Sequence, residues 1–148
     1  MAKSPGTKRP PRAKKQPSLG DADPSVAYHR PLSWALVEAE VAGQWGWHKL
    51  AQDQLLFLYA KLLDYEKDSL AKLKRERRAR QIPTEHLSEE AQRRLERRRR
   101  DDAEIWELRL GHQKWRVWGT IRGSVFFMLW WDPNHTVCRG MPQGVRRG

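Results

Sequence analysis

Residues 105–138, IWELRLGHQKWRVWGTIRGSVFFMLWWDPNHTVC, constrain the fold more than any other part of this 148-residue chain. Apolar and polar residues alternate over 105–110 and again over 115–121, as they do in strands with one buried face. The next segment, 125–131, is nearly all apolar, which suits a central strand covered on both faces. Short turns that contain glycine separate these segments. The sequence therefore predicts three consecutive antiparallel strands.

Two helices are expected before these strands. Leucines recur at spacings of three, four and seven within residues 51–80, which predicts an amphipathic helix that ends before Pro83. Ser88, followed by two glutamates, is typical of a helix N-cap and predicts a second helix that runs to about Asp102.

Residues 32–43 alternate loosely and predict a first strand, although a short helix over 34–41 remains open because alanine, leucine and glutamate favour helices. The order of elements predicts an α+β domain over residues 26–138, with both helices packed on one face of a small antiparallel sheet. Residues 1–25 are expected to be a disordered basic tail, because prolines and charges leave too few apolar residues for a core. Residues 139–148 are expected to be a flexible tail.

Positive charge dominates the chain, since 29 Lys and Arg against 18 Asp and Glu give a formal net charge of +11. Such a surplus indicates an anionic partner, either a nucleic acid or an acidic protein, although a solvated basic surface is the simpler alternative. The basic residues cluster in the N-terminal tail and at the end of the second predicted helix. The candidates there for contacts with phosphate are Lys14, Lys15, Arg97, Arg98, Arg99 and Arg100.

Cysteine usage and hydropathy narrow the cellular compartment and the kinds of ligand to be expected. Cys138 is the one cysteine, which excludes an internal disulfide and a CxxC zinc framework and suits a reducing cytoplasm. No apolar run approaches the roughly 18 residues that span a bilayer, so no membrane partner is expected. Neither a metal nor a cofactor is expected, because Asp132, His135 and Cys138 lack a regular ligand spacing and no nucleotide-binding or hydrolase motif occurs.

The first two predicted strands carry basic residues at alternating positions. Alternation places Glu107 and Arg109 on one side of their strand. Arg116 lies beside Trp118 on one side of the next strand. If these sides coincide, two guanidiniums with Lys114 at the rim can bind a phosphate, and an exposed Trp118 can stack on a base. The alternative is that basic residues cover a solvent face and the tryptophans fill the core.

The turn Asp132-Pro133-Asn134-His135 follows the third strand abruptly. Aspartate bonds to the backbone ahead of it and proline fixes φ, so this is a defined local structure. His135 is a candidate general acid or base. Alternatively, its ring only satisfies a backbone group in the turn.

The strand pair ELRL…KWRVWG and the element order over residues 51–137 resemble the RelE/ParE superfamily of small bacterial toxins. The most specific part is Arg109 before a tight turn and Trp115-Arg116-Val117-Trp118 after it. The resemblance implies two helices followed by a curved antiparallel sheet. It also implies that Arg116 contacts a scissile phosphate and that Arg109 binds a neighbouring one. Superfamily members with ribonuclease activity cut messenger RNA in the ribosomal A site.

The chain departs from this pattern at two places. Glu107 stands where a further basic residue is expected. Asp132-Pro133-Asn134-His135 stands where a basic residue and a tyrosine are expected, with His135 as the candidate substitute for the proton donor. The segment VFFMLWWDPNHTVC also resembles the ending of small prokaryotic and phage proteins that have no assigned activity.

The sequence thus predicts a RelE-like toxin that acts on RNA or the ribosome as a metal-independent endoribonuclease, with Arg109, Arg116 and His135 as catalytic residues. An acidic antitoxin-like protein is a further expected partner. Two alternatives remain open, namely a non-catalytic basic nucleic-acid-binding protein and a protein-interaction domain with an acidic partner.

Overall fold

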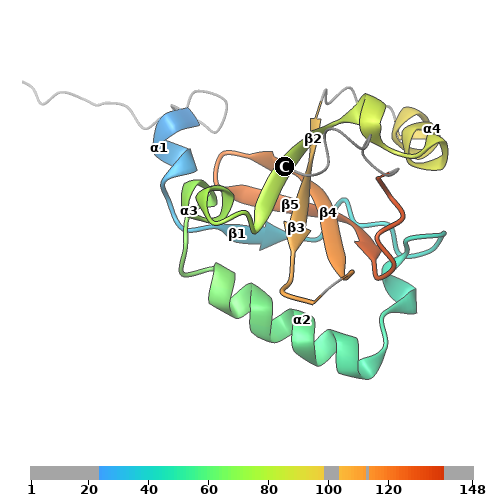
Figure 1. The fold of residues 1–148 in the computed structure, drawn as a ribbon, viewed down its shortest axis with the longest axis horizontal. Coiled ribbons are helices and arrows are strands. Elements are labelled where there is room, and N and C mark those ends of the chain that lie inside the picture. Colours follow the sequence, from blue (N-terminus) through green and yellow to red (C-terminus); the bar gives the residue numbers. More distant parts are fainter. Residues whose placement is uncertain (1–23, 99–103, 113, 139–148) are drawn as a thin grey trace, which may run out of the picture.

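The structure is a computed structural model that describes residues 24–98, 104–112 and 114–138 (Figure 1). The helices are α1 (Pro24–Tyr28), α2 (Gln52–Tyr65), α3 (Leu70–Arg75) and α4 (Glu89–Arg97), with short 3-10 turns at Trp47–Lys49 and Thr84–His86. The strands are β1 (Ser33–Ala35), β2 (Ala79–Pro83), β3 (Glu104–Arg109), β4 (Arg116–Arg122) and β5 (Val125–Asp132). Four predicted phosphate contacts lie outside the described residues: Lys14, Lys15, Arg99 and Arg100.

The strands form one mixed sheet in the order β1-β5-β4-β3-β2. The pairs β2–β3, β3–β4 and β4–β5 are antiparallel, which confirms the α+β class and the three predicted strands. β1 is parallel to β5 and is much shorter than the predicted strand over 32–43. The chain turns away after Ala35, where Ala39 N donates to Leu36 O over 3.0 Å.

The single long helix predicted over residues 51–80 is wrong. α2 ends at Tyr65, and a new helix starts after Ser69, whose Oγ accepts a hydrogen bond from Lys72 N over 3.2 Å. Arg77 has φ of 63°, a left-handed conformation that cannot continue a right-handed helix. The chain then becomes β2, an edge strand of the sheet.

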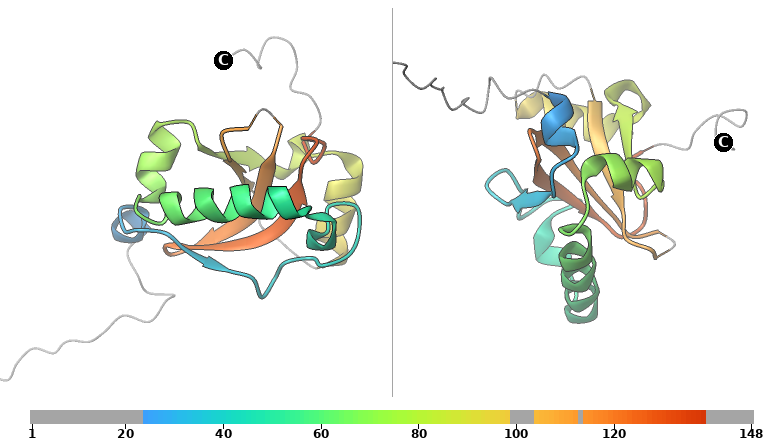
Figure 2. Two further views of the ribbon diagram at one scale, coloured as in Figure 1. Left: turned by 90° about the horizontal axis from the view of Figure 1, so that it is seen from below. Right: turned by 90° about the vertical axis from the view of Figure 1, so that its left-hand side faces the viewer.

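Helices cover both faces of the sheet, whereas one covered face was predicted (Figure 2). The core under α2 and α3 includes Leu58, Tyr65, Leu73, Trp106 and Leu108. The core under α4 includes Ala91, Leu95, Ile105, Trp118 and Trp130. Neighbouring residues of β3 therefore point to opposite faces, as their alternation predicts. The predicted N-cap is confirmed, since Ser88 Oγ accepts from Ala91 N over 3.2 Å.

α2 contacts the sheet along a narrow strip. Only Leu58 and Tyr65 of this helix are fully buried. Its outward side exposes four large apolar residues, Leu55, Leu56, Tyr59 and Leu63. Among the residues that the structure describes, no helix is both long enough and apolar enough to cross a membrane.

Candidate functional site

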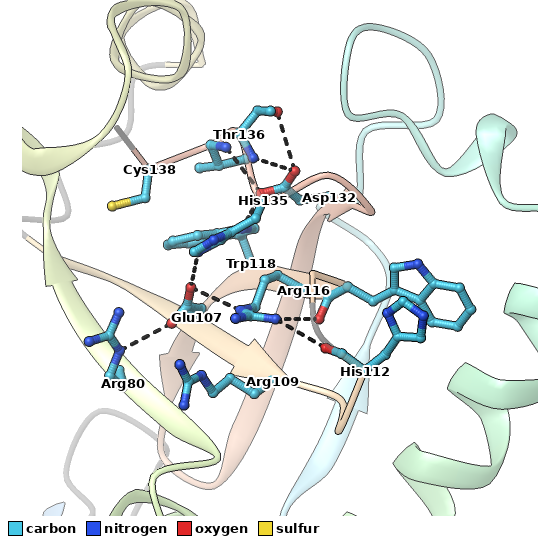
Figure 3. A network of polar contacts seen from close by, with 12 residues as sticks. Arg80, Glu107, Arg109, His112, Arg116, Trp118, Asp132, His135, Thr136 and Cys138 are labelled. Atoms are coloured by element: carbon cyan, nitrogen blue, oxygen red, sulfur yellow. Dashed lines mark hydrogen bonds and ion pairs between the residues drawn. The ribbon is translucent and has the colours of Figure 1, made fainter. Parts of the chain in front are cut away.

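A buried carboxylate organises the polar end of the sheet face that α4 covers (Figure 3). Glu107, on β3, is 0 % exposed. Arg80 Nε donates to its Oε1 over 3.1 Å, and Arg116 Nε donates to its Oε2 over 3.2 Å. His135 Nε2 donates to the same Oε2 over 2.9 Å. We name these four residues, together with Arg109, the Glu107 cluster.

Strand register brings the cluster together. Arg80 is paired with Glu107 across β2 and β3, and Arg109 is paired with Arg116 across β3 and β4. Alternate residues of a strand share a face, so Glu107 and Arg109 lie on the same side of the sheet. As predicted, Arg109 and Arg116 share a face. His135 reaches them from the turn after β5.

Arg109 adds a third guanidinium beside the carboxylate. Its backbone is fixed, because its N donates to Arg78 O over 2.8 Å and its O accepts from the Tyr65 hydroxyl over 2.6 Å. Its Nε is buried and has no hydrogen-bond partner among the described residues. Three arginines around one carboxylate give a formal charge of 3 − 1 = +2, with His135 left out. The cluster therefore has an excess of donors and positive charge that an anion can satisfy.

Arg116 is a buried link and not the open side chain that was expected. It is 5 % exposed, and its Nη1 donates to Trp115 O over 3.1 Å and to His112 O over 3.4 Å. Burial lowers the pKa of Arg116, Glu107 opposes that shift, and the positive charge of Arg109 adds to it. Arg116 thus joins the cluster to the loop between β3 and β4.

Glu107 remains ionised throughout the neutral range. Burial alone would raise the pKa of Glu107, but the hydrogen bond from His135 and the charges of Arg80 and Arg116 outweigh burial and bring that pKa to about 2. A carboxylate this acidic and this buried is a poor base for a substrate proton. It acts instead as a fixed acceptor that sets the orientation of the His135 ring.

The Asp132 turn holds His135 in place. Asp132 is fully buried and accepts hydrogen bonds from the backbone N of Thr136 over 2.9 Å and of Val137 over 3.0 Å. Trp118 Nε1 also donates to it over 3.0 Å. These bonds close a tight turn in which His135 has φ of 58°. Asp132 therefore has a structural role and leaves His135 as the functional candidate of this turn.

The predicted stacking role of Trp118 is wrong. Its side chain is 0 % exposed, because the face of β4 that was expected to be open lies under α4. Its indole N–H is used by Asp132. Lys114, by contrast, is exposed on the loop between β3 and β4.

The basic end of α4 is partly neutralised by acids of the same chain. Arg98 Nη2 donates to Glu38 O over 2.6 Å, and its Nη1 lies 3.5 Å from a carboxylate oxygen of Glu40. Arg97 lies 3.7 Å from a carboxylate oxygen of Glu90. Arg98 thus fastens α4 to the segment that follows β1, and Arg97 remains mostly exposed.

Two members of the cluster were missed in the sequence. Glu107 shares the alternation of Arg109, so the sequence places it on the basic face, but a lone acid on that face looks only like a departure from the family pattern. Arg80 was hidden because its segment was predicted as helix. No local signal in the sequence reveals that Arg80 pairs with β3, which follows only after α4.

No metal centre is indicated, because no group of three His, Cys, Asp or Glu side chains within the described residues is arranged to hold an ion. No protein-family model, no curated protein and no solved structure matches the chain.

Proposed function

We propose that the Glu107 cluster binds the phosphodiester backbone of RNA and cleaves it without a metal, as the RelE/ParE resemblance implies. The observation that supports this proposal is the meeting of Arg109, Arg116 and His135 around one buried carboxylate. A cationic phosphate site with a partly exposed, oriented imidazole is what metal-independent phosphoryl transfer requires.

The chemistry is an internal transesterification. The ribose 2′-oxygen bonds to phosphorus, the bond from phosphorus to the 5′-oxygen breaks, and a 2′,3′-cyclic phosphate and a 5′-hydroxyl result. The proton of the 2′-hydroxyl passes to water. Arg80 and Arg109 stabilise the charge that develops on the non-bridging oxygens.

His135 supplies the proton that the leaving 5′-oxygen needs. Its Nε2 is used by Glu107, and no hydrogen bond to its Nδ1 is present among the described residues. Nδ1 is therefore the atom that faces the substrate. The His135 side chain is 37 % exposed, which is enough for contact with a bound strand.

The test is cleavage of a single-stranded RNA by purified protein in the presence of EDTA. His135→Asn is the sharpest variant, because asparagine tolerates the left-handed backbone of this position and cannot donate a proton as an acid. We expect its cleavage rate to fall by about 10²-fold or more, the usual contribution of a general acid. Arg109→Gln should have a similar effect.

Arg93→Gln is the matched control, since it removes one positive charge from an exposed position of α4 outside the cluster. It should cleave like the wild type. Unchanged cleavage by folded His135→Asn would refute the assignment of the acid. RNA that is bound but left intact by the wild type would instead make the protein a non-catalytic binding module.

A further inference from the structure

The loop between β3 and β4 carries a stack of two aromatic rings. The His112 and Trp115 rings lie 3.8 Å apart between centroids, with 10° between their planes. Among the ring pairs of the described residues this is the parallel one, and the others are tilted or edge-on. His112 is exposed and Trp115 is half-buried, so the stack ends in a planar ring that faces solvent.

The inner ring is fixed from two sides. Phe57, on α2, meets Trp115 edge-on with 5.2 Å between centroids and 88° between planes. Trp131, on β5, meets it with 6.0 Å between centroids and 60° between planes. Phe57 also lies edge-on to His112, at 6.3 Å. The stack is therefore backed by two elements of the core and presents a preformed surface.

The same loop is tied to the Glu107 cluster. Arg116 Nη1 donates to the backbone oxygens of both His112 and Trp115, while its Nε donates to Glu107 (Figure 3). Arg109 ends β3 and Arg116 starts β4, so the loop that carries the stack lies directly beyond the cationic end of the sheet, and its Trp115 ring packs on the α2 side of that end. Lys114 lies exposed between the two rings in sequence and adds a positive charge to this edge.

We propose that the stacked rings of His112 and Trp115 form a platform for a nucleobase of single-stranded RNA whose backbone phosphate occupies the Glu107 cluster. The inference rests on the proposed function and adds a base-binding subsite to it. The His112 ring is covered on one face by Trp115 and is open to solvent on the other. It therefore offers a base the same kind of surface as an aromatic side chain in a single-strand-binding groove. Such stacking accepts any base, because every base has a π-face.

The test compares two uncleavable ligands by fluorescence anisotropy: a labelled 2′-O-methyl oligoribonucleotide and an abasic oligomer of equal length and charge. His112→Ala should weaken binding of the base-containing oligomer by about 5- to 100-fold, the usual range for one stacked base. It should leave binding of the abasic oligomer unchanged. His112→Tyr, which keeps a planar ring, should bind both ligands like the wild type.

The outcomes separate this inference from the proposed function. If wild type and His112→Ala bind both oligomers equally, the platform is wrong and the phosphate site stands. A His112→Tyr variant that is folded but as weak as His112→Ala also overturns the platform. If the wild type binds neither oligomer, both the platform and the proposed function are overturned.

Discussion

At the scale of single residues, the central fact is a carboxylate that receives hydrogen bonds from two arginines and a histidine inside the protein. A buried charge is tolerated only when its partners are present, and removing one partner exposes the full cost of burying the other. Glu107 therefore couples the stability of the fold to the integrity of the proposed site, and variants of the cluster must be chosen with that coupling in view.

Arg116→Ala should lower the free energy of unfolding by about 3–5 kcal/mol, because it leaves a fully buried carboxylate short of its buried partner. Arg80→Ala removes a side chain that is 39 % exposed, so water can replace it and the loss should be about 1 kcal/mol. Urea unfolding of the two variants gives the comparison. If Arg116→Ala lowers the free energy of unfolding by less than about 1 kcal/mol, the ion pair between Arg116 and Glu107 does not stabilise the fold as expected.

The low pKa of Glu107 also predicts how stability depends on pH. The ordinary pKa of a glutamate is 4.5, and the pKa of Glu107 in the folded protein is about 2. Ionised Glu107 therefore stabilises the fold fully above about pH 4.5. The contribution, roughly 3 kcal/mol from the size of the shift, is lost as the pH falls from about 4.5 to 2.

Urea unfolding at pH 6, 4 and 3 measures the larger part of this loss, about 2 kcal/mol by pH 3. In Glu107→Gln, which cannot ionise, the decline over the same interval should be smaller by a similar amount. Equal pH dependence in the two proteins would contradict the assignment of the low pKa to Glu107.

At the scale of elements, the close approach of β4 and β5 depends on one glycine. The register of the pair shifts between Trp118 and Gly119, and a Cβ at Gly119 would lie 2.2 Å from the backbone O of Phe127 and 2.6 Å from the Phe126 ring. Gly119→Ala should therefore force the two central strands apart and lower the melting temperature sharply. Ser124→Ala, in the adjoining hairpin loop, is the control and should melt like the wild type. Similar melting temperatures for both would show that the strands can yield.

The elements divide into those that local sequence predicts and those that it does not. β3, β4 and β5 were predicted because alternation and glycine turns are local signals. The end of α2 was missed because Leu70 and Leu73 continue the leucine spacing into a second helix, where they are buried in the same core. The left-handed backbone conformation of Arg77 could not be predicted, because nothing in the sequence distinguishes this arginine from the other basic residues around it. β2 is a strand only because β3 pairs with it.

The same division applies to the site. That Arg109 and Arg116 share a face follows from alternation and one hairpin. That Arg80 and His135 join them depends on pairing between distant segments and on a turn built around a buried aspartate. The role expected for Trp118 failed because the sequence did not show that α4 crosses to the second face of the sheet.

At the scale of the whole molecule, the net charge is +11. The basic residues behind it are balanced by acids to different degrees in different parts of the structure. On α4 the described arginines face Glu40 and Glu90, so much of that charge is balanced within the protein. Around Glu107 the arginines outnumber the carboxylate, and the imbalance persists. Binding of a polyanion should therefore depend more on this end of the sheet than on the surplus of charge as a whole.

The parallel pairing of β1 with β5 determines when, during synthesis, the first strand of the sheet can pair. Among the strands that the structure describes, β5 is synthesised last, and it alone joins β1 to the others. On a ribosome the first strand of the sheet therefore has no neighbour until residues 125–127 have emerged. The turn that carries His135 follows later still. The Glu107 cluster can therefore assemble only after every strand of the described sheet has been synthesised.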